Sequence, residues 1–329
     1  MVDPPPEALA PDADSPGRKR VLSGVAGVAV AAVVLWTFRD VHWAALRSQL
    51  SAVRPGGVII AAGLNLTVIT VQSLRWFTLV RPLAPAARFL DAWRALFIGL
   101  AFSTILPARA GEVARVRHFS RATGVGAASV VGSILLDYLV NGAGLVAFLG
   151  FMPLFVDVPL WIRPGALVAL VVFLLGLAVA FWMRPAAAAV VPNPLLPFNR
   201  VSVLEGTRTG FAAARHAGPI SVAVGAALLS WTLEVFVALF AMRAVDLNLP
   251  LSAAFMVLLA VNLAVAVPFG PPGNLGTLEV GATLALLQYG VLKEQALAFC
   301  VVYHLLQVVP VGSLGLLLAS QGSDLPRPV

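Results

Sequence analysis

The 329-residue chain contains 60% hydrophobic and only 11% charged residues, with a formal net charge of +7. Soluble domains carry about 25% charged residues, so the composition excludes an ordinary soluble fold. Nucleic acid is excluded as a partner because the basic residues lie between apolar runs and form no basic face. They fit the cytoplasmic excess of Arg and Lys in membrane proteins. The one cysteine, Cys300, excludes an internal disulfide and is expected to be a packing residue.

Residues 1–20 are rich in Pro, Ala and Asp and end in Arg18, Lys19 and Arg20, which predicts a disordered cytoplasmic tail. The uncharged run that follows exceeds the ~7–15 residues of a signal-peptide core, so we expect a retained anchor. A spanning helix needs about 20 mainly apolar residues. That criterion predicts a transmembrane domain over 21–320, before a short tail at 321–329. Its six full spans are Val21–Phe38, Gly56–Val80, 126–150, Pro164–Met183, Ala217–Met242 and Gln295–Ser320.

Two segments do not read as simple spans. Residues 93–121 begin apolar, break at Pro107–Gly111 and continue with Arg115, Arg117, His118 and Arg121. That second arm is too charged to cross lipid, so the segment is predicted to be a re-entrant helical hairpin whose break is covered by protein or water. Residues 250–290 form a second helix–break–helix unit, apolar enough either to re-enter or to cross. The predicted fold class is therefore an all-α polytopic membrane protein with two hairpins.

The distribution of basic residues predicts the orientation. With the N-terminus inside, fifteen basic residues lie on the cytoplasmic side and six outside, with Arg75 within a span. We therefore expect both termini in the cytoplasm and the protein in the inner membrane of the cell. Asn199–His216 is the predicted inner-surface helix. The tryptophans near predicted span ends, expected in an interfacial belt, are Trp36, Trp43, Trp76, Trp161 and Trp182.

The two halves share one plan, which predicts an internal repeat over about 56–150 and 217–320. Each half has a charged span, a Pro-Gly break, a Gly-Val pair and a further span with polar residues. Gly124 precedes Asp137 by 13 residues, and Gly290 precedes Tyr303 by 13. The predicted topology places the first hairpin inside and the second outside. Such an inverted repeat is common in transporters that bind their cargo near the membrane midplane.

Four ionisable residues lie within predicted spans: Arg75, Asp137, Glu234 and Glu279. Each costs on the order of 2.5–3.5 kcal/mol to insert on translocon scales, so each needs a partner. Two alternatives are open for these residues. They form structural ion pairs, or they bind a lipid headgroup or a proton. His304 is either a hydrogen-bonded core histidine or a proton relay.

The first break holds Arg109, Glu112 and Arg115. Glu112 and Arg115 are spaced i,i+3 and can simply pair, and Arg109 can extend to the inner headgroups. The functional alternative is an anion site. A helix that begins after Gly111 has free N–H groups, and an arginine fork matches phosphate.

Several catalytic patterns are missing. Gly111, Arg115 and Gly124 reproduce part of a CDP-alcohol phosphotransferase motif, but its metal-binding aspartates are replaced by Pro107, Ala110, Ala128 and Gly132. The sequence also lacks a P-loop, an HExxH motif and a nucleophile elbow. We therefore expect no metal, no cofactor and no enzymatic activity.

Two stretches carry a resemblance to a known family. The first runs from Ser73-Leu-Arg75-Trp76 to the Pro107-Ala-Arg109-Ala-Gly111-Glu112 element, and the second is Pro272-Gly-Asn-Leu-Gly276-Thr-Leu-Glu279. Over roughly residues 20–320 the chain resembles the lysylphosphatidylglycerol synthase transmembrane family. That resemblance implies a flippase for an anionic phospholipid or a polyprenyl- or glycolipid. Only nine residues follow Ser320, so no aminoacyl-transferase domain is expected.

The resemblance implies that one set of residues lines the lipid route: Arg75, Arg109, Glu112, Arg115, Asp137, Glu234 and Glu279. The supporting residues are Asn141, Asn274, Tyr303 and His304. Two alternatives stay open. One is a lipid-modifying enzyme that uses Glu112 or Asp137 as acid–base group, and the other is an accessory subunit of a lipid-synthesis complex. The expected partners are membrane lipid, a second copy of the chain or a lipid-synthesis enzyme.

Overall fold

A computed structural model describes residues 39–106, 110–151, 171, 174–175, 178, 200–265 and 272–321, and every regular element among them is helical. The longer helices are α2 (Trp43–Ser51), α3 (Pro55–Val80), α4 (Phe89–Ile105), α5 (Ala110–Thr123), α6 (Ala127–Phe151), α8 (Arg200–Thr209), α9 (Ala217–Ala244), α10 (Leu251–Val265), α11 (Thr277–Leu287) and α12 (Lys293–Gln321). Three single turns are η1 (Arg81–Leu83), η3 (Ala212–Arg215) and η4 (Pro272–Asn274). The predicted all-α class is confirmed.

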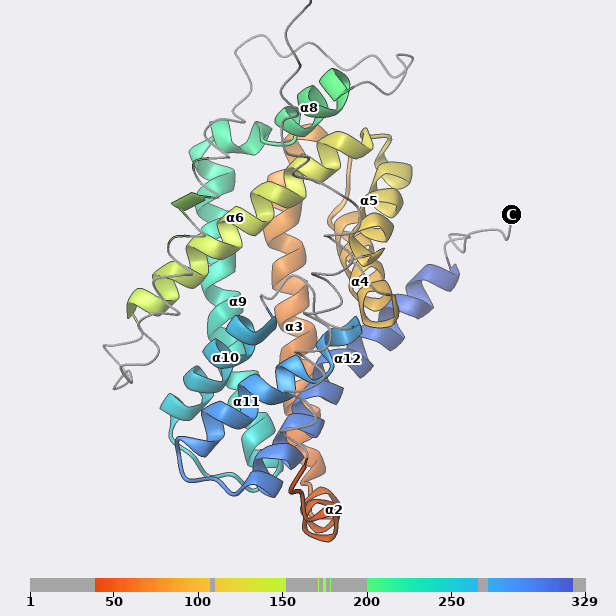
Figure 1. Ribbon diagram of the computed structural model, residues 1–329. Coiled ribbons are helices and arrows are strands. Elements are labelled where there is room, and N and C mark those ends of the chain that lie inside the picture. Colours follow the sequence, from red (N-terminus) through yellow and green to blue (C-terminus); the bar gives the residue numbers. More distant parts are fainter. Residues whose placement is uncertain are drawn as a thin grey trace, which may run out of the picture.

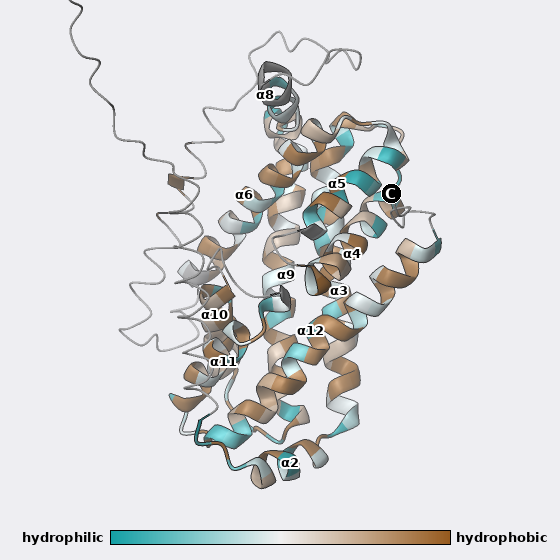
Figure 2. Ribbon diagram, turned by 45° about the vertical axis from the view of Figure 1, so that its right-hand side comes forward, coloured by the Kyte–Doolittle hydropathy of each residue, from teal (hydrophilic) through white to brown (hydrophobic). Residues whose placement is uncertain are grey.

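Four helices are long and apolar enough to span a bilayer: Pro55–Leu83, Ala127–Phe148, Ala217–Ala244 and Lys293–Gln321. They correspond to four of the six predicted spans. Val21–Phe38 lies outside the described residues, and only four residues of Pro164–Met183 are described. Brown, hydrophobic residues run along these helices in Figure 2. The chain is a polytopic membrane protein.

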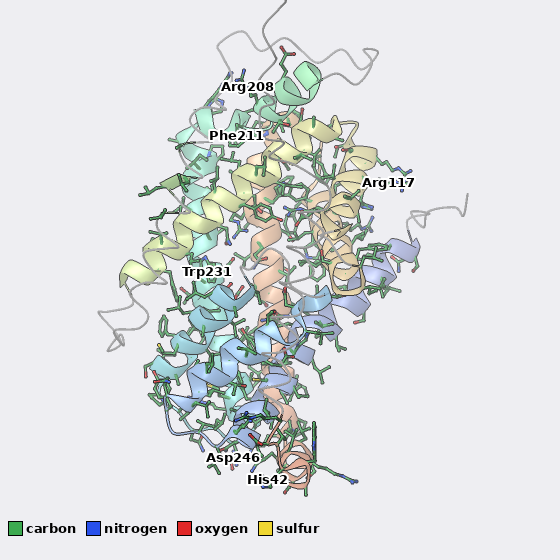
Figure 3. All side chains as sticks on the ribbon, in the orientation of Figure 1. His42, Arg117, Arg208, Phe211, Trp231 and Asp246 are labelled. Carbon is green, nitrogen blue, oxygen red and sulfur yellow. The ribbon has the colours of Figure 1, made fainter. Side chains whose placement is uncertain are left out.

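Helices α3 and α9 run antiparallel through the centre of the bundle (Figure 1). At one end the Arg54 N–H donates to the Ala244 carbonyl over 2.8 Å. A Cβ on Gly57 would lie 2.9 Å from the Ala244 Cα, so glycine is what lets the two backbones approach there. We call this end the α2 end and the opposite end the α8 end; Figure 3 shows His42 and Asp246 at the first and Arg208 and Phe211 at the second.

The first hairpin consists of α4 and α5, and both of its outer ends lie at the α8 end (Figure 1). The 17 residues of α4 rise about 25 Å, short of the ~30 Å hydrocarbon core. The two arms are in intimate contact, because a Cβ on Gly111 would lie 2.0 Å from both the Gly99 carbonyl oxygen and Ser103 Oγ. The predicted return of this segment to its starting side is confirmed.

The second hairpin consists of α10 and α11, whose outer ends lie at the α2 end (Figure 1). A Cβ on Gly281 would lie 2.7 Å from the Ala260 carbonyl oxygen, so glycine again allows close contact between the arms. Gly273, Asn274 and Gly276 all have positive φ and turn the chain back. The alternative that sequence left open is thereby decided: residues 250–290 re-enter and do not cross.

The tips of the two hairpins meet beside the middle of α12. A Cβ on Gly273 would lie 3.4 Å from the Thr104 carbonyl oxygen, and one on Gly312 would lie 3.8 Å from Thr104 Oγ1. Hairpins that enter from opposite ends and touch at their tips are the arrangement an inverted repeat predicts. The turns that follow the two hairpins also correspond to each other. Gly124 and Gly290 have φ of 74° and 71°, and each lies three residues before the next span.

Helix α12 contains Pro310, which has no N–H to donate to the Leu306 carbonyl one turn earlier. Asn65 of α3 takes over that role, its Nδ2 donating to Leu306 O over 2.9 Å. An interrupted helix in a membrane needs such a substitute donor. The contact links the central span to the helix that both hairpin tips touch.

The predicted surface segment is present as α8 and η3 at the α8 end. It lies across the start of α6, where a Cβ on Gly132 would be only 2.0 Å from the Thr207 carbonyl oxygen. Phe211, between α8 and η3, is buried in one cluster with Leu79 and Leu136. The segment therefore packs onto the span bundle itself.

Candidate functional site

The centre of the first half is an ion pair between α3 and α6. Arg75 Nε donates to Asp137 Oδ1 over 2.7 Å, and Nη2 reaches Oδ2 at 3.4 Å. Arg75 Nη1 donates to Asn141 Oδ1 over 2.6 Å. Asp137 and Asn141 are one turn apart, so they share the face of α6 that meets α3. Both charges are buried. The structural ion pair, which is one of the two alternatives given by the sequence, is therefore present.

Arg115 brings a second guanidinium to the same carboxylate, from hairpin helix α5. Its Nη2 lies 3.5 Å from Asp137 Oδ2, and its Cζ lies 4.0 Å above the ring of Trp76. The Trp76 Nε1–H donates to Ser133 Oγ over 3.1 Å. The expectation that Trp76 lies in an interfacial belt is wrong: it is fully buried, because a cation–π contact with Arg115 and a hydrogen bond hold it inside.

One side of this cluster is open. Glu112 accepts a short hydrogen bond from the Tyr138 hydroxyl, and its Oε2 lies 3.7 Å from Arg115 Nη1. The Glu112 side chain is 34% exposed and Tyr138 is 43% exposed. Arg115 Nε and Glu112 Oε2 have no hydrogen-bond partner. Both atoms are buried, and buried polar atoms normally have a hydrogen-bond partner, so the cluster keeps unused hydrogen-bonding capacity behind the exposed parts of Glu112 and Tyr138.

Exposed apolar side chains lie on the same two helices. Val131, Leu135 and Tyr138 lie on one exposed face of α6, and Val113 of α5 is exposed beside Glu112. We call Val113, Val131 and Leu135 the apolar lip. A charged cluster beside exposed apolar side chains suits an amphipathic molecule with a polar head and an apolar body.

The helix start at the first break differs in detail from the prediction. Helix α5 begins at Ala110, one residue before Gly111. Gly111 therefore lies in the first turn and packs against Gly99 of α4, where any side chain would clash. Pro107 and Arg109 lie outside the described residues, so the proposed role of Arg109 stays a prediction.

The second half holds a different polar centre. Glu279 Oε1 lies 2.7 Å from His304 Nδ1, and Glu279 Oε2 accepts the Gly276 N–H over 2.7 Å at the start of α11. Both side chains are buried. No hydrogen bond or ion pair between described residues joins this pair to the Arg75–Asp137 cluster. The single lipid route drawn from sequence therefore has two separate polar centres.

Three other predicted residues form no hydrogen bond or ion pair with either centre in the part of the chain that the structure describes, although Glu234 lies near enough to Arg75 to interact with its charge. Glu234 of α9 is half-buried and accepts a hydrogen bond from Gln72 Nε2 over 3.4 Å. Tyr303 is buried and stacks on Phe299 at 5.2 Å between ring centroids. Asn274 is exposed at the second break, with φ of 58°. Gln72 was missed by sequence reasoning, although it precedes Arg75 by one helical turn.

The fold and these buried charges define a class: a polytopic helical membrane protein with two opposed re-entrant hairpins and ion pairs between its spans. Residues 24–315 match the family described as the lysylphosphatidylglycerol synthase TM region. The chain belongs to this family, which gives it a lipid-related role in the membrane and confirms the resemblance seen in the sequence. No curated protein matches the chain. Within the described residues no group of three or more His, Cys, Asp or Glu could hold a metal ion.

Proposed function

We propose that the chain moves a lipid with a phosphate-bearing headgroup between leaflets, and that the headgroup binds at the first-half cluster. The observation that carries this proposal is the open side of that cluster. There the exposed parts of Glu112 and Tyr138 lie next to the apolar lip, and behind them the buried Arg115 Nε and Glu112 Oε2 atoms form no hydrogen bond. Family membership supports a lipid as the cargo. The proposed headgroup site rests on the cluster as a whole and not on any one of its residues.

The chemistry of the cluster suits such a headgroup. When the Glu112 and Tyr138 side chains turn aside, a phosphate oxygen can reach the buried Arg115 Nε and accept its hydrogen in the fork geometry that guanidinium prefers. Glu112 and the Tyr138 hydroxyl, which bond each other, can turn to a hydroxyl or ammonium of the same headgroup. Asp137 holds both arginines in place when no lipid is bound, which avoids an unpaired buried charge. The acyl chains lie along Val131 and Leu135.

The orientation forms part of the proposal. The hairpin helix α5, the following turn and the α8–η3 segment carry Arg117, Arg121, Arg200, Arg208 and Arg215 at the α8 end. Excess arginine in such segments marks the cytoplasmic side. The α8 end then faces the cytoplasm of the cell, and the first-half cluster receives lipid from the inner leaflet.

The test is lipid transport in proteoliposomes that contain labelled phospholipid. We expect Arg115→Lys to slow transport at least about tenfold, because a lost charge-assisted hydrogen bond costs about 1.5–3 kcal/mol and ~1.4 kcal/mol is tenfold in rate. Arg109→Ala is expected to act similarly, with Arg109→Lys rescuing only part. The matched control is Arg117→Lys, two residues from Arg115 on the same helix, where the side chain projects away from the bundle (Figure 3).

The same vesicles separate the alternatives. A covalently changed lipid, found by mass spectrometry, would favour a lipid-modifying enzyme. No movement and no product, together with loss of a neighbouring synthase after deletion of the gene, would favour an accessory subunit. Equal transport by wild type, Arg115→Lys and Arg109→Ala at matched protein levels would discard the headgroup site.

A further inference from the structure

The second hairpin buries a titratable pair that the proposed headgroup site does not use. Glu279 Oε1 and His304 Nδ1 are 2.7 Å apart. With a neutral imidazole whose Nδ1–H donates to the carboxylate, the pair carries one net negative charge in an apolar hairpin. A proton added at Nε2 converts it into a neutral imidazolium–carboxylate pair. The added proton thus removes a net charge that is costly to bury.

The geometry leaves the required atom available. His304 Nδ1 is engaged by Glu279, and Glu279 Oε2 by the Gly276 N–H. Among the described residues no hydrogen bond is found for His304 Nε2. The proton therefore binds to and leaves from Nε2, while Nδ1 keeps the ring oriented. A histidine whose other nitrogen is fixed by a carboxylate is a common arrangement for proton exchange.

A pocket at the α2 end extends along α11 in the direction of this pair. It is lined by Arg39, Asp40 and Lys293, and on α11 it reaches Thr283 and Val280. Thr283 is one helical turn from Glu279, and its Oγ1 lies 3.4 Å from Cys300 Sγ. The Cys300 thiol in turn points to the Glu279 carbonyl, at 3.5 Å. This is a column of polar atoms within an otherwise apolar hairpin.

Few other ionisable groups face the pair. On α12 itself, Tyr303 and Cys300 flank His304, while Lys293 and Glu294 lie at the α2 end. Helix α10 contains no ionisable residue, α9 offers Glu234, and α3 offers Arg75, which is held by Asp137. The tip half of α4 has none, since Asp91 and Arg94 lie near its start. The pair is thus the main proton acceptor of the second hairpin.

We propose that the Glu279–His304 pair is a proton-binding site that drives lipid movement, with protons entering from the α2 end. The proposal rests on the proposed function. Protonation neutralises the pair and keeps α11 packed on α12. Loss of the proton restores a buried negative charge, which loosens the second hairpin. Because its tip touches Thr104 of the first hairpin, that change reaches the end of α4.

The experiment imposes a pH gradient on proteoliposomes that contain the full chain and labelled phospholipid. One proton per lipid raises the accumulation ratio about tenfold per unit of pH difference. We expect wild type to respond, and His304→Gln and Glu279→Gln to lose the response. The matched control is His42→Gln, because His42 forms the same type of pair with Glu294, over 3.0 Å, but is exposed at the surface. It is expected to respond as wild type does.

A second readout does not depend on transport. Infrared titration of the purified protein between about pH 5 and pH 8 should show an imidazole protonation that His304→Gln removes and His42→Gln keeps. Transport without a response to the gradient, or a full response in His304→Gln, would overturn the proton site while the proposed function stands. If wild type moves no lipid at all, the proposed function fails, and the infrared titration still decides whether the pair takes up a proton.

Discussion

The two halves of the bundle share a scaffold and differ in their chemistry. In each, a hairpin, a left-handed glycine and a long span follow one another, with Gly124 and Gly290 at equivalent turns. The first half surrounds one aspartate with two arginines, which remain charged at any working pH. The second half pairs a glutamate with a histidine, which is neutral or cationic depending on whether it holds a second proton. A repeated fold can thus hold a permanent charge cluster and a switchable one.

The two polar centres also differ in how far they are enclosed by the protein. In the first cluster Glu112 and Tyr138 are partly exposed beside the apolar lip, and two of its buried polar atoms form no hydrogen bond. In the second centre Glu279 is held by His304 and by the Gly276 backbone. An open centre suits a large ligand and an enclosed one suits a proton, which is why we assign them different roles.

The largest expected effect comes from removing the shared carboxylate of the first cluster. Asp137→Asn leaves Arg75 buried without a counter-charge and Arg115 with Glu112 alone, 3.7 Å away, and breaking a buried ion pair costs about 3–5 kcal/mol. Glu279→Gln should cost less, because His304 can become neutral. Thermal unfolding in detergent measures both.

The matched control for Asp137→Asn is Asp246→Asn. Asp246 pairs with Arg54 over 2.8 Å, but both side chains are mostly exposed, where ion pairs contribute about 0–1 kcal/mol. Asparagine also tolerates the positive φ of residue 246. If Asp137→Asn and Glu279→Gln destabilised the protein equally, the contrast between the two centres would be lost.

The next largest effect is expected from the glycines that allow close contact between the two arms of each hairpin. In Gly111→Ala the new Cβ meets the Gly99 carbonyl oxygen and Ser103 Oγ at 2.0 Å, whereas in Gly281→Ala it meets the Ala260 carbonyl oxygen at 2.7 Å. We expect the first change to cost the upper end of about 1–3 kcal/mol and the second less. Unfolding midpoints in detergent provide the comparison.

Gly225→Ala serves as its control, because nothing lies within 4 Å of a Cβ at that position in α9. Alanine is about 0.5–1 kcal/mol better than glycine inside a helix, so this variant should be slightly more stable than wild type. A smaller loss in Gly111→Ala than in Gly281→Ala would mean that the first hairpin is the looser of the two.

The smallest effect concerns the contact between the central span and α12. Asn65→Ala removes the donor to Leu306 O, and hydrogen bonds between membrane helices contribute about 0.6 kcal/mol on average. Adding Pro310→Ala restores a backbone N–H that can bond to the same carbonyl. The double variant should therefore be more stable than Asn65→Ala alone. A double-mutant cycle without coupling would show that Asn65 does not compensate for Pro310.

Sequence reasoning singled out residues of both centres but did not assign their partners. Arg75, Asp137 and Glu279 were singled out because charges inside spans need partners. The helix rotation that brings His304 to Glu279, 25 residues away, is not visible in composition, and the single lipid route stays a prediction. Trp76 was misassigned because burial on Arg115 depends on the position of α5.

The sequence by itself determined that the chain is helical and membrane-embedded, where its described spans lie, and where the hairpins break. These properties are local, since hydropathy and Pro-Gly breaks act over one helix length. The tertiary structure decided which charges pair, which side of the first cluster is open, and that 250–290 re-enters. Those outcomes depend on contacts between backbones distant in sequence, such as Gly111 against Gly99 and Gly273 against Thr104, which only the packed bundle brings together.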